Sequence, residues 1–527
     1  LHPSNIHDCE YAIGSINFTG DSPVILTRDG PSLGGFVCPV TIARAELWKV
    51  GQVKPGDKIR FTLMSYDQAV ALEQVQDTCV ATLSGPLPRV LDGAAEAAAM
   101  PMNARSAIVG GLPADVARPR VTYRQAGDGY LLLEYGENVL DLALRLRIHL
   151  LMQALRANAV PGIEELSPGV RSLQIRYDSK TISQKELIAR LLWIEQGLTD
   201  AARAKVPTRV LYLPMAFEDS ATLGAVERYR ETVRERAPWL PNNVDFIQRI
   251  NGLDTRDEVR RIVFDASYLV MGLGDVYLGA PCAVPLDPRH RLLTSKYNPA
   301  RTFTAEGTVG IGGVYMCIYG MDSPGGYQLV GRTLPIWNKF LNNPVFQEGK
   351  PWLLRFFDQV RFYPVTEAEL ETLRADFRAG RAGVRIEEEV FDFAEYQRFL
   401  ADNAASIEAF QARQRTAYEA EVKLWQTEDI VAGEAPVPEL AEDAPLEAGQ
   451  SLVAADMSGS VWKIVVEVGQ QVEAGDPLVV IEAMKMELTV AAPSAGIVSA
   501  IRCTRGRLVN TGDPLIVLDE IVVTAEI

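Results

Sequence analysis

Hydrophobic and polar residues alternate with different periods along the chain, and each change of period marks a predicted structural unit. Residues 1–83 contain short β-like runs (SPVILTRDG, GFVCPVTIA and DKIRFTLM) that glycine and proline separate. The run VGQVKPGDKIRF, with its PGD turn, is predicted to form the last hairpin of this β-rich unit. Residues 84–118 lose the period and are predicted to be a linker.

Residues 119–205 combine the period of strands with that of helices. VTYRQAGDGYLLLEYG predicts two strands, and the leucines of DLALRLRIHLLMQALRA recur near helical spacing. VRSLQIRYD predicts a further strand, and Ser183 is placed to cap a helix over SQKELIARLLWIEQGL. The order β-β-α-β-α predicts a small α/β unit with helices on one face of its sheet.

Glycine and β-branched residues return in residues 206–365, where a helical insertion around 220–237 interrupts the predicted strands. This pattern predicts a β-barrel or a compressed sandwich. Residues 366–426 carry an apolar stripe and are predicted to be a helical segment. Residues 427–450 are acidic and rich in alanine and proline, with too few large apolar residues for a core, so they are predicted to be a flexible linker.

Length and charge narrow the class of protein. A chain of 527 residues is too long for one core and predicts three or four domains. The net charge of −16 argues against nucleic acid as a partner. No apolar run approaches the length of a membrane span, and the amino terminus lacks the features of a signal peptide, so we expect a cytoplasmic protein without a membrane partner.

The cysteines and histidines argue against a metal centre. Six cysteines are scattered without CxxC spacing and are predicted to be buried thiols in a reducing compartment. The four histidines show neither HxH nor HExxH spacing. We therefore predict no metal site.

An internal repeat occupies residues 451–520. SGSVWKIVVEVGQQVEAGDPLVVIE matches AGIVSAIRCTRGRLVNTGDPLIVLD, so that both copies contain the tetrapeptide GDPL. The repetition of strand, turn and strand predicts two similar β halves about a pseudo-twofold axis. Lys485, between Met484 and Met486, lies at the turn that joins the halves. A lysine displayed on a rigid hairpin beyond a flexible linker suits a covalent carrier.

The stretch EAMKMEL within this repeat resembles the biotinyl carrier domain of biotin-dependent carboxylases. The resemblance implies an all-β, lipoyl-like hammerhead domain in which a biotin protein ligase attaches biotin to Lys485 through an amide. Met484 and Met486 would then line the place where ligase and cofactor approach. Related lipoyl domains usually carry a DKA-type sequence at this turn, so the methionines favour biotin.

Two further parts of the chain resemble the allophanate hydrolase-like family, whose two subunits are fused in urea carboxylases and urea amidolyases. Residues 206–337 are similar to the subunit 1-like half through APWLPNNVDFIQRINGL, GLGDVYLGAPCAVPLDPRHRL and YGMDSPGGYQLVGRT. Residues 1 to about 65 are similar to the closing part of the subunit 2-like half. The resemblance implies a mixed α/β and β fold, with a cyclophilin-like β-barrel beside the small α/β sheet domain.

The resemblance also implies which steps the chain performs. It contains no convincing phosphate-binding loop, since GIGG is a weak match, so ATP and Mg are expected only on a biotin carboxylase domain not present here. We therefore expect a fragment or one piece of a split enzyme that works with a biotin carboxylase domain or subunit. It would transfer a carboxyl group from carboxybiotin to urea or a similar small amide. The product, allophanate, would pass to an allophanate hydrolase. The chain could also form a homo-oligomer.

Two alternatives stay open at this stage. Guanidine is planar and similar in size to urea but cationic, so its site would need an additional carboxylate. A non-enzymatic binding module that regulates another protein is the second alternative. The carrier domain discriminates against that module, because a regulator has no use for a biotinyl lysine.

The chemistry of urea suggests the residues of its site. Urea presents several N–H donors and one carbonyl acceptor, so the site needs several acceptors and one donor. Polar residues within the family-like runs supply candidates for the catalytic role: Asp275, Tyr277, Lys296 and Asn298. Candidates for substrate contacts come from both halves: Asn5, Asp8, Tyr297, Asp322 and Ser323.

Each candidate also has an ordinary structural interpretation. An aspartate after glycine, such as Asp275, commonly forms a turn, and Lys296 is ordinary as a solvated charge. Asn242, Asn243 and Asn251 would cap a helix near residue 245. Only the gathering of polar residues in the most family-like runs favours the functional interpretation.

Overall fold

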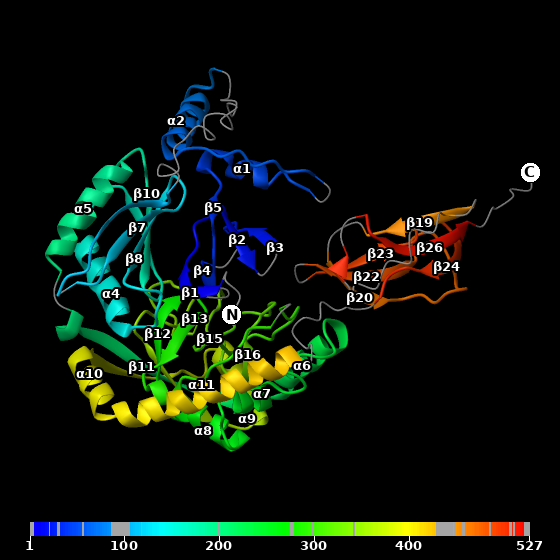
Figure 1. The fold of residues 1–527 in the computed structure, drawn as a ribbon. Coiled ribbons are helices and arrows are strands. Elements are labelled where there is room, and N and C mark those ends of the chain that lie inside the picture. Colours follow the sequence, from blue (N-terminus) through cyan, green and yellow to red (C-terminus); the bar gives the residue numbers. More distant parts are fainter. Residues whose placement is uncertain are drawn as a thin grey trace, which may run out of the picture.

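The computed structural model describes most of the chain, and the fold below refers to that part. The described residues are 5–19, 22–28, 32–54, 57–85, 106–116, 118–198, 201–274, 279–297, 300–340, 343–427, 446, 449–455, 459–483, 486–504, 508–509 and 512–520. A large body of strands and helices contains everything up to α11, and the C-terminal strands form a separate β domain beside it (Figure 1).

The N-terminal unit consists of two small antiparallel sheets and two helices. Strand β1 pairs with β4, and β3, β2 and β5 form the second sheet in that order. The elements are β1 (Asn5–Glu10), β2 (Ser15–Thr19), β3 (Ser22–Ile25), β4 (Leu33–Phe36), β5 (Val40–Thr41), α1 (Leu47–Val50) and α2 (Tyr66–Thr82).

A five-stranded antiparallel sheet with two helices follows, in the order β6-β7-β8-β10-β9. Its elements are β6 (Ile108–Leu112), β7 (Val121–Gln125), β8 (Tyr130–Tyr135), α4 (Leu142–Ala157), β9 (Ile163–Pro168), β10 (Ser172–Tyr177) and α5 (Gln184–Gln196). Of the leucines predicted at helical spacing, Leu144, Leu151 and Leu155 share one core with the strands, whereas Leu142 belongs to a second core on the barrel side. Ser183 caps α5 in a capping box with Glu186, as predicted. In Figure 1 both helices lie on the outer side of the sheet.

A closed barrel forms the centre of the body. Its strands follow the order β16-β14-β15-β13-β12-β17-β11, and β11 also pairs with β16, so the ring closes. The strands are β11 (Lys205–Phe217), β12 (Tyr268–Leu273), β13 (Pro281–Pro285), β14 (Thr308–Gly312), β15 (Tyr315–Ile318), β16 (Gln328–Arg332), β17 (Gln359–Pro364) and β18 (Arg385–Asp392), the last on the far edge of β11. The predicted barrel is confirmed.

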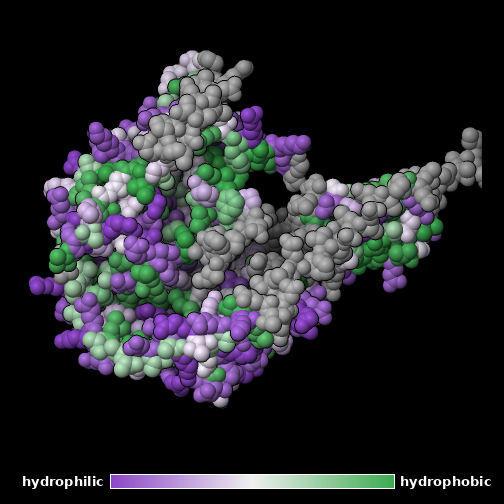
Figure 2. Space-filling model, in the orientation of Figure 1, coloured by the Kyte–Doolittle hydropathy of each residue, from purple (hydrophilic) through white to green (hydrophobic). Residues whose placement is uncertain are grey.

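Helices surround the barrel and lead toward the C-terminal domain. They are α6 (Ser220–Thr232), α7 (Asn243–Ile250), α8 (Arg256–Asp265), α9 (Glu367–Arg378), α10 (Phe393–Asp402) and α11 (Ala404–Thr427). Asn242 caps α7 by accepting hydrogen bonds from the N–H groups of Val244 and Asp245. On the face shown in Figure 2, hydrophilic residues are spread over the large body. Among the described helices, none combines the length and the apolar character needed to cross a membrane.

The C-terminal domain confirms the predicted repeat. Its two four-stranded sheets have the orders β19-β26-β24-β21 and β23-β22-β20-β25. The strands are β19 (Gln450–Ala454), β20 (Gly459–Ile464), β21 (Gln471–Val472), β22 (Pro477–Ala483), β23 (Met486–Ala491), β24 (Gly496–Ile501), β25 (Leu508–Val509) and β26 (Pro514–Glu520). The short strand of each repeat pairs with the other repeat, β21 with β24 and β25 with β20. The equivalent glycines Gly475 and Gly512 have φ of +93° and +92°, which favours glycine at both turns.

The structure corrects several boundaries drawn from the sequence. The predicted linker 84–118 contains β6, which pairs with β7. The predicted helical segment 366–426 contains β18, which pairs with β11 over eight residues. The β-like run DKIRFTLM forms no strand, and Phe61 within it is 60% exposed. Nearly all of the predicted linker 427–450 lies outside the described residues.

Candidate active site

Asp8 and Lys296 meet at Gly35, where the N-terminal unit contacts the barrel. Asp8 lies on β1, Gly35 lies on the paired strand β4, and Lys296 lies between the barrel strands β13 and β14. A Cβ added to Gly35 would lie 2.8 Å from Asp8 Oδ1 and 3.7 Å from Lys296 Nζ. The carboxylate and the ammonium therefore approach the same point of the backbone. We call these residues, with Phe36 and Tyr327, the Asp8–Lys296 junction.

Two aromatic rings hold the Lys296 ammonium at this junction. Nζ lies 5.2 Å from the ring centroid of Phe36 and 5.2 Å from that of Tyr327. Phe36 belongs to the N-terminal unit and Tyr327 to the barrel side, so the lysine is held between the two. Cation–π contacts of this kind fix the direction of an ammonium group and stabilise its charge. The ordinary interpretation of Lys296 as a solvated surface charge does not describe this half-buried position.

Asp8 is fixed by contacts to the two other units. Its side chain is 2% exposed, and Cys282 Sγ donates to its Oδ2 at 3.4 Å. Its backbone carbonyl accepts a hydrogen bond from the N–H of Val170 at 3.0 Å. Leu33, Val170 and Cys282 belong to one core that also includes residues of α4 and β12. The N-terminal unit, the five-stranded sheet and the barrel thus all meet at Asp8.

His7 adds an imidazole beside the junction, and the sequence analysis had considered it only as a metal ligand. Its Nδ1 forms a 2.5 Å hydrogen bond with the hydroxyl of Tyr315 on β15. Burial lowers the pKa of His7, while Asp8 raises it and Arg171 lowers it further. The net lowering favours the uncharged imidazole near neutral pH.

A second polar layer lies behind Asp8 and was also missed. Glu10, on the same strand, accepts a hydrogen bond from Ser172 Oγ at 2.7 Å, and its Oε1 has no partner among the described residues. Arg145 on α4 is 0% exposed and donates through Nε to the carbonyl of Met271 at 2.5 Å. Its two terminal nitrogens have no partner in the described part of the chain. Burial lowers the pKa of Arg145 to about 9, while Glu10 and Cys282 raise it.

The titration of Glu10 makes the stability of this layer depend on pH. Burial raises the pKa of Glu10 to about 7, and the contacts with Ser172, backbone groups and Arg145 lower it only in part. A raised pKa means that the folded state favours the protonated acid. The stability that the protonated Glu10 side chain contributes is fully present below pH 4.5, its ordinary pKa, and is lost as the pH rises through about 7.

We therefore expect the stability of the wild type relative to Glu10→Gln to fall as pH rises from about 4.5 to above 7. The full change is about 3 kcal/mol, since one pKa unit corresponds to about 1.4 kcal/mol. Thermal melts of both proteins at several pH values measure the difference, and glutamine cannot titrate. A difference that stays constant across this range would contradict the assignment.

Gly35 is required for space at the junction. A Cβ there would lie 2.6 Å from the carbonyl oxygen of Ile6, a backbone atom that cannot rotate away, besides approaching Asp8. We expect Gly35→Ala to lower stability by about 1–3 kcal/mol through overpacking against Ile6 and Asp8. Gly224→Ala on α6, where the added Cβ meets nothing within 4 Å, is the matched control. Equal melting temperatures for the two variants would contradict this expectation.

Several candidates from the sequence fall outside the described residues: Asp275, Tyr277, Asn298, Met484 and Lys485. The residues flanking the first pair are described. The N–H of Gly274 donates to the carbonyl of Ala280 at 2.7 Å, and a Cβ on Gly274 would lie 2.1 Å from Ser32 Oγ. The chain therefore enters and leaves residues 275–278 at one point, next to the N-terminal unit. Asn5 begins β1, three residues before Asp8.

The remaining candidates make structural contacts. The hydroxyl of Tyr297 is within 2.6 Å of Asn243 Nδ2 and 3.0 Å of Asn243 Oδ1, inside an aromatic cluster. The prediction that Asn243 caps α7 is wrong, because the cap is Asn242. Asp322 Oδ1 accepts a hydrogen bond from the N–H of Glu306 at 2.7 Å, and Ser323 Oγ donates to the carbonyl of Met321. These three side chains are not brought together with Asp8 and Lys296 in any described contact.

Two glycines near Lys296 serve packing. Neither Gly325 nor Gly326 has a positive φ, so neither position requires glycine for a left-handed backbone conformation. A Cβ on Gly325 would lie 2.1 Å from the hydroxyl of Tyr319, and one on Gly326 would lie 3.7 Å from Lys296 Cβ. Within the described ranges, no group of three or more His, Cys, Asp or Glu residues is arranged to hold a metal ion.

Comparison with known proteins places these units in a family. Residues 1–63 match the carboxyltransferase domain, subdomain A and B, and residues 121–347 match its subdomain C and D. Residues 449–518 match the family of biotin-requiring enzymes. Urea amidolyase from Saccharomyces cerevisiae is 47% identical over 93% of this chain, and that from Lachancea kluyveri is 48% identical over 93%. Over most of its length the chain is therefore similar to one part of the urea amidolyases.

A solved structure supports the same relationship. The crystal structure of the Kluyveromyces lactis urea carboxylase matches with a TM-score of 0.84 and 46% identity, covering 98% of this chain and 45% of that one. The chain spans 26% and 27% of the length of the two urea amidolyases. The chain therefore combines regions that match a carboxyltransferase domain with a C-terminal domain that matches biotin-requiring enzymes, and the Asp8–Lys296 junction joins the region matching subdomains A and B to the region matching subdomains C and D.

Proposed function

We propose that this chain transfers a carboxyl group from biotin, carried on Lys485, to urea and so forms allophanate. The observation that supports the proposal best is the Asp8–Lys296 junction, in a chain homologous to urea amidolyases. A carboxylate acceptor and an ammonium donor converge there from two subdomain pairs. Biotin carboxylation with ATP would take place on a separate biotin carboxylase domain or subunit.

The junction fits the hydrogen-bonding groups of urea. Lys296 would donate to the oxygen of urea or to the oxyanion that develops as the new N–C bond forms. Asp8 Oδ1 would accept from an N–H group, which fixes the plane of the substrate. Asp275 and Tyr277, next to Gly274 in the sequence, remain proposed contacts, as do Asn5 and Asn298. The uncharged imidazole of His7 would hold Tyr315 at the edge of the site without adding a positive charge.

The C-terminal domain fits a covalently carried biotin. Strand β22 ends at Ala483 and β23 begins at Met486, and these two residues pair directly. Met484 and Lys485 join them in the sequence, so a two-residue connection between paired strands carries the lysine. Biotin attached there supplies the carboxyl group that is transferred. A biotin protein ligase and an allophanate hydrolase acting on the product are further proposed partners.

The test is a single-turnover reaction. Biotinylated chain, labelled with a carboxyl group by a supplied biotin carboxylase, is mixed with urea, and the label should appear in allophanate. Guanidine is the comparison substrate, and we expect it to react more slowly, because the ammonium of Lys296 repels a cation. Faster transfer to guanidine, or no transfer to urea by chain that retains its label, would overturn the proposal.

A further inference from the structure

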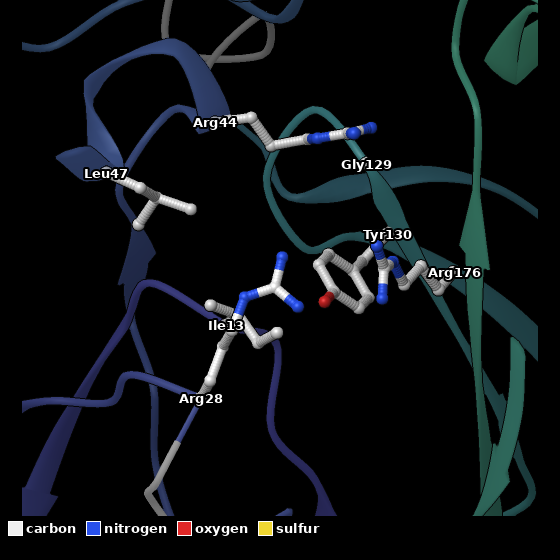
Figure 3. Close-up of a pocket in the computed structure, with 7 residues that line it drawn as sticks. All are labelled: Ile13, Arg28, Arg44, Leu47, Gly129, Tyr130 and Arg176. Atoms are coloured by element: carbon white, nitrogen blue, oxygen red, sulfur yellow. The ribbon is translucent and has the colours of Figure 1, made fainter. Parts of the chain in front are cut away.

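Three arginines converge on a hollow that the proposed reaction does not use. The hollow lies between the N-terminal unit and the five-stranded sheet, at the end of β10 opposite Ser172 (Figure 3). It measures ≈ 320 Å³ including its open side. Its lining comprises Ile13, Arg28, Arg44, Leu47, Gly129, Tyr130 and Arg176. In the view of Figure 3 the guanidinium groups of Arg28 and Arg176 lie on opposite sides of the Tyr130 ring.

Two of the three arginines have carboxylate partners at the hollow, and the carboxylate of Asp128 also accepts from the backbone N–H of Arg44. Arg44 Nε lies 3.3 Å from Glu73 Oε1, and Arg176 Nε lies 2.7 Å from Glu164 Oε2. Arg28 forms no ion pair or hydrogen bond with any residue that the structure describes. Of the three arginines, Arg28 is therefore the one that no described carboxylate contacts.

Arg44 also keeps a donor that no described residue uses. Its Nη1 is buried and has no hydrogen-bond partner in the described part of the chain. Gly129 provides the space for this arrangement, since an added Cβ would lie 2.7 Å from Arg44 Cδ and 3.2 Å from Nη1. Burial raises the pKa of Tyr130, so its hydroxyl stays protonated and remains a donor group on the same lining.

We propose that this hollow binds a small tetrahedral oxyanion of the phosphate class. Guanidinium groups favour phosphoryl oxygens because two parallel N–H groups match two oxygens. A dianion suits three converging arginines better than a planar monocarboxylate does. Arg28 and Arg44 come from the N-terminal unit, and Arg176 comes from the sheet. The bound anion therefore ties the two units together.

Calorimetric titration of the chain with inorganic phosphate tests the proposal, at constant ionic strength in chloride. We expect saturable binding that Arg28→Gln and Arg176→Gln each weaken by roughly tenfold or more. Arg190→Gln, an exposed arginine on α5, makes the same charge change and should leave the affinity unchanged. Phosphate should also raise the melting temperature of the wild type but not that of the two hollow variants.

Acetate in place of phosphate separates the two anion classes. We expect at least tenfold weaker binding of acetate, because it offers one charge and a planar pair of oxygens. No measurable phosphate binding, equal weakening by Arg190→Gln, or acetate bound as tightly as phosphate would each overturn the proposal. Arg28 is exposed, so its replacement tests the site without disturbing the core.

Discussion

Replacing Lys485 with arginine is expected to abolish biotin incorporation and to leave the carrier domain folded. The amide to biotin requires a nucleophilic primary amine, and a guanidinium keeps the positive charge without supplying that amine. The repeat region 451–520 contains only two lysines, Lys463 and Lys485. Lys463 lies within β20, opposite Val480 of β22, whereas Lys485 is in the sequence between the paired ends of β22 and β23. Only Lys485 has the position of a displayed lysine.

Intact-mass measurement after treatment with a biotin protein ligase checks this expectation. The wild type and Lys463→Arg should both gain one biotin, and Lys485→Arg should gain none. The melting temperature of the carrier domain should be the same in all three proteins, because arginine conserves charge and length. A biotin increment on Lys485→Arg, or its loss from Lys463→Arg, would show that the attachment site is elsewhere.

The repeat made the carrier domain predictable from the sequence. The two GDPL turns occupy the same place in both copies of the repeat, so each copy has the same order of strands and turns. This order indicates which strands of the two copies are equivalent. The left-handed glycines Gly475 and Gly512 follow from the same turns. The barrel was predictable for a related reason. Its strands are short, apolar and separated by glycine-rich turns, and fully buried strands have this composition.

Strands β6 and β18 could not be predicted because tertiary pairing overrides their composition. The sequence of β18, RIEEEVFD, is dominated by charged residues, which are depleted in strands. It is nevertheless a strand because β11 continues past the closed ring and offers a free edge for eight residues. Strand β6 contains two glycines and belongs to the sheet only through β7. The partner of β18 is distant in sequence, whereas β7 follows β6 closely, so the two glycines of β6 are what hid that strand.

The site was predictable only in part, for the same physical reason. Asp8 and Lys296 were selected as polar residues in family-like runs, and the structure brings them to one point. Their convergence depends on Gly35, which no local pattern marks as special. Arg145 had a visible signal, since a charged residue within the apolar face of α4 needs a buried partner. Glu10, whose charge raises the pKa of Arg145, lies on another unit, so the proximity of the two residues could not be assigned from sequence.

Replacing Lys296 with methionine is expected to reduce carboxyl transfer to urea by about 10²–10³-fold, or about 2.7–4 kcal/mol. Methionine keeps the length and the apolar contacts with Phe36 and Tyr327 but removes the charge and the N–H donors. The loss should appear mainly in the rate constant of transfer, because the charge that Lys296 stabilises develops in the transition state. Biotinylation and the melting temperature should change little, since the carrier domain is separate and the rings still pack on the side chain.

Lys339→Met is the matched control for this prediction. Lys339 also lies over an aromatic ring, with Nζ 5.8 Å from the centroid of Phe340, but on an exposed surface. Both variants lose one positive charge and at least one cation–π contact. Any difference between their transfer rates therefore reflects the location of Lys296 next to Gly35 and Asp8. Single-turnover transfer should be near the wild-type rate for Lys339→Met. If the transfer rate of Lys296→Met is within about threefold of that of Lys339→Met, Lys296 lowers the free energy of the transition state by less than about 0.7 kcal/mol. The lysine would then only pack between its rings, and the donor to urea would have to come from another residue.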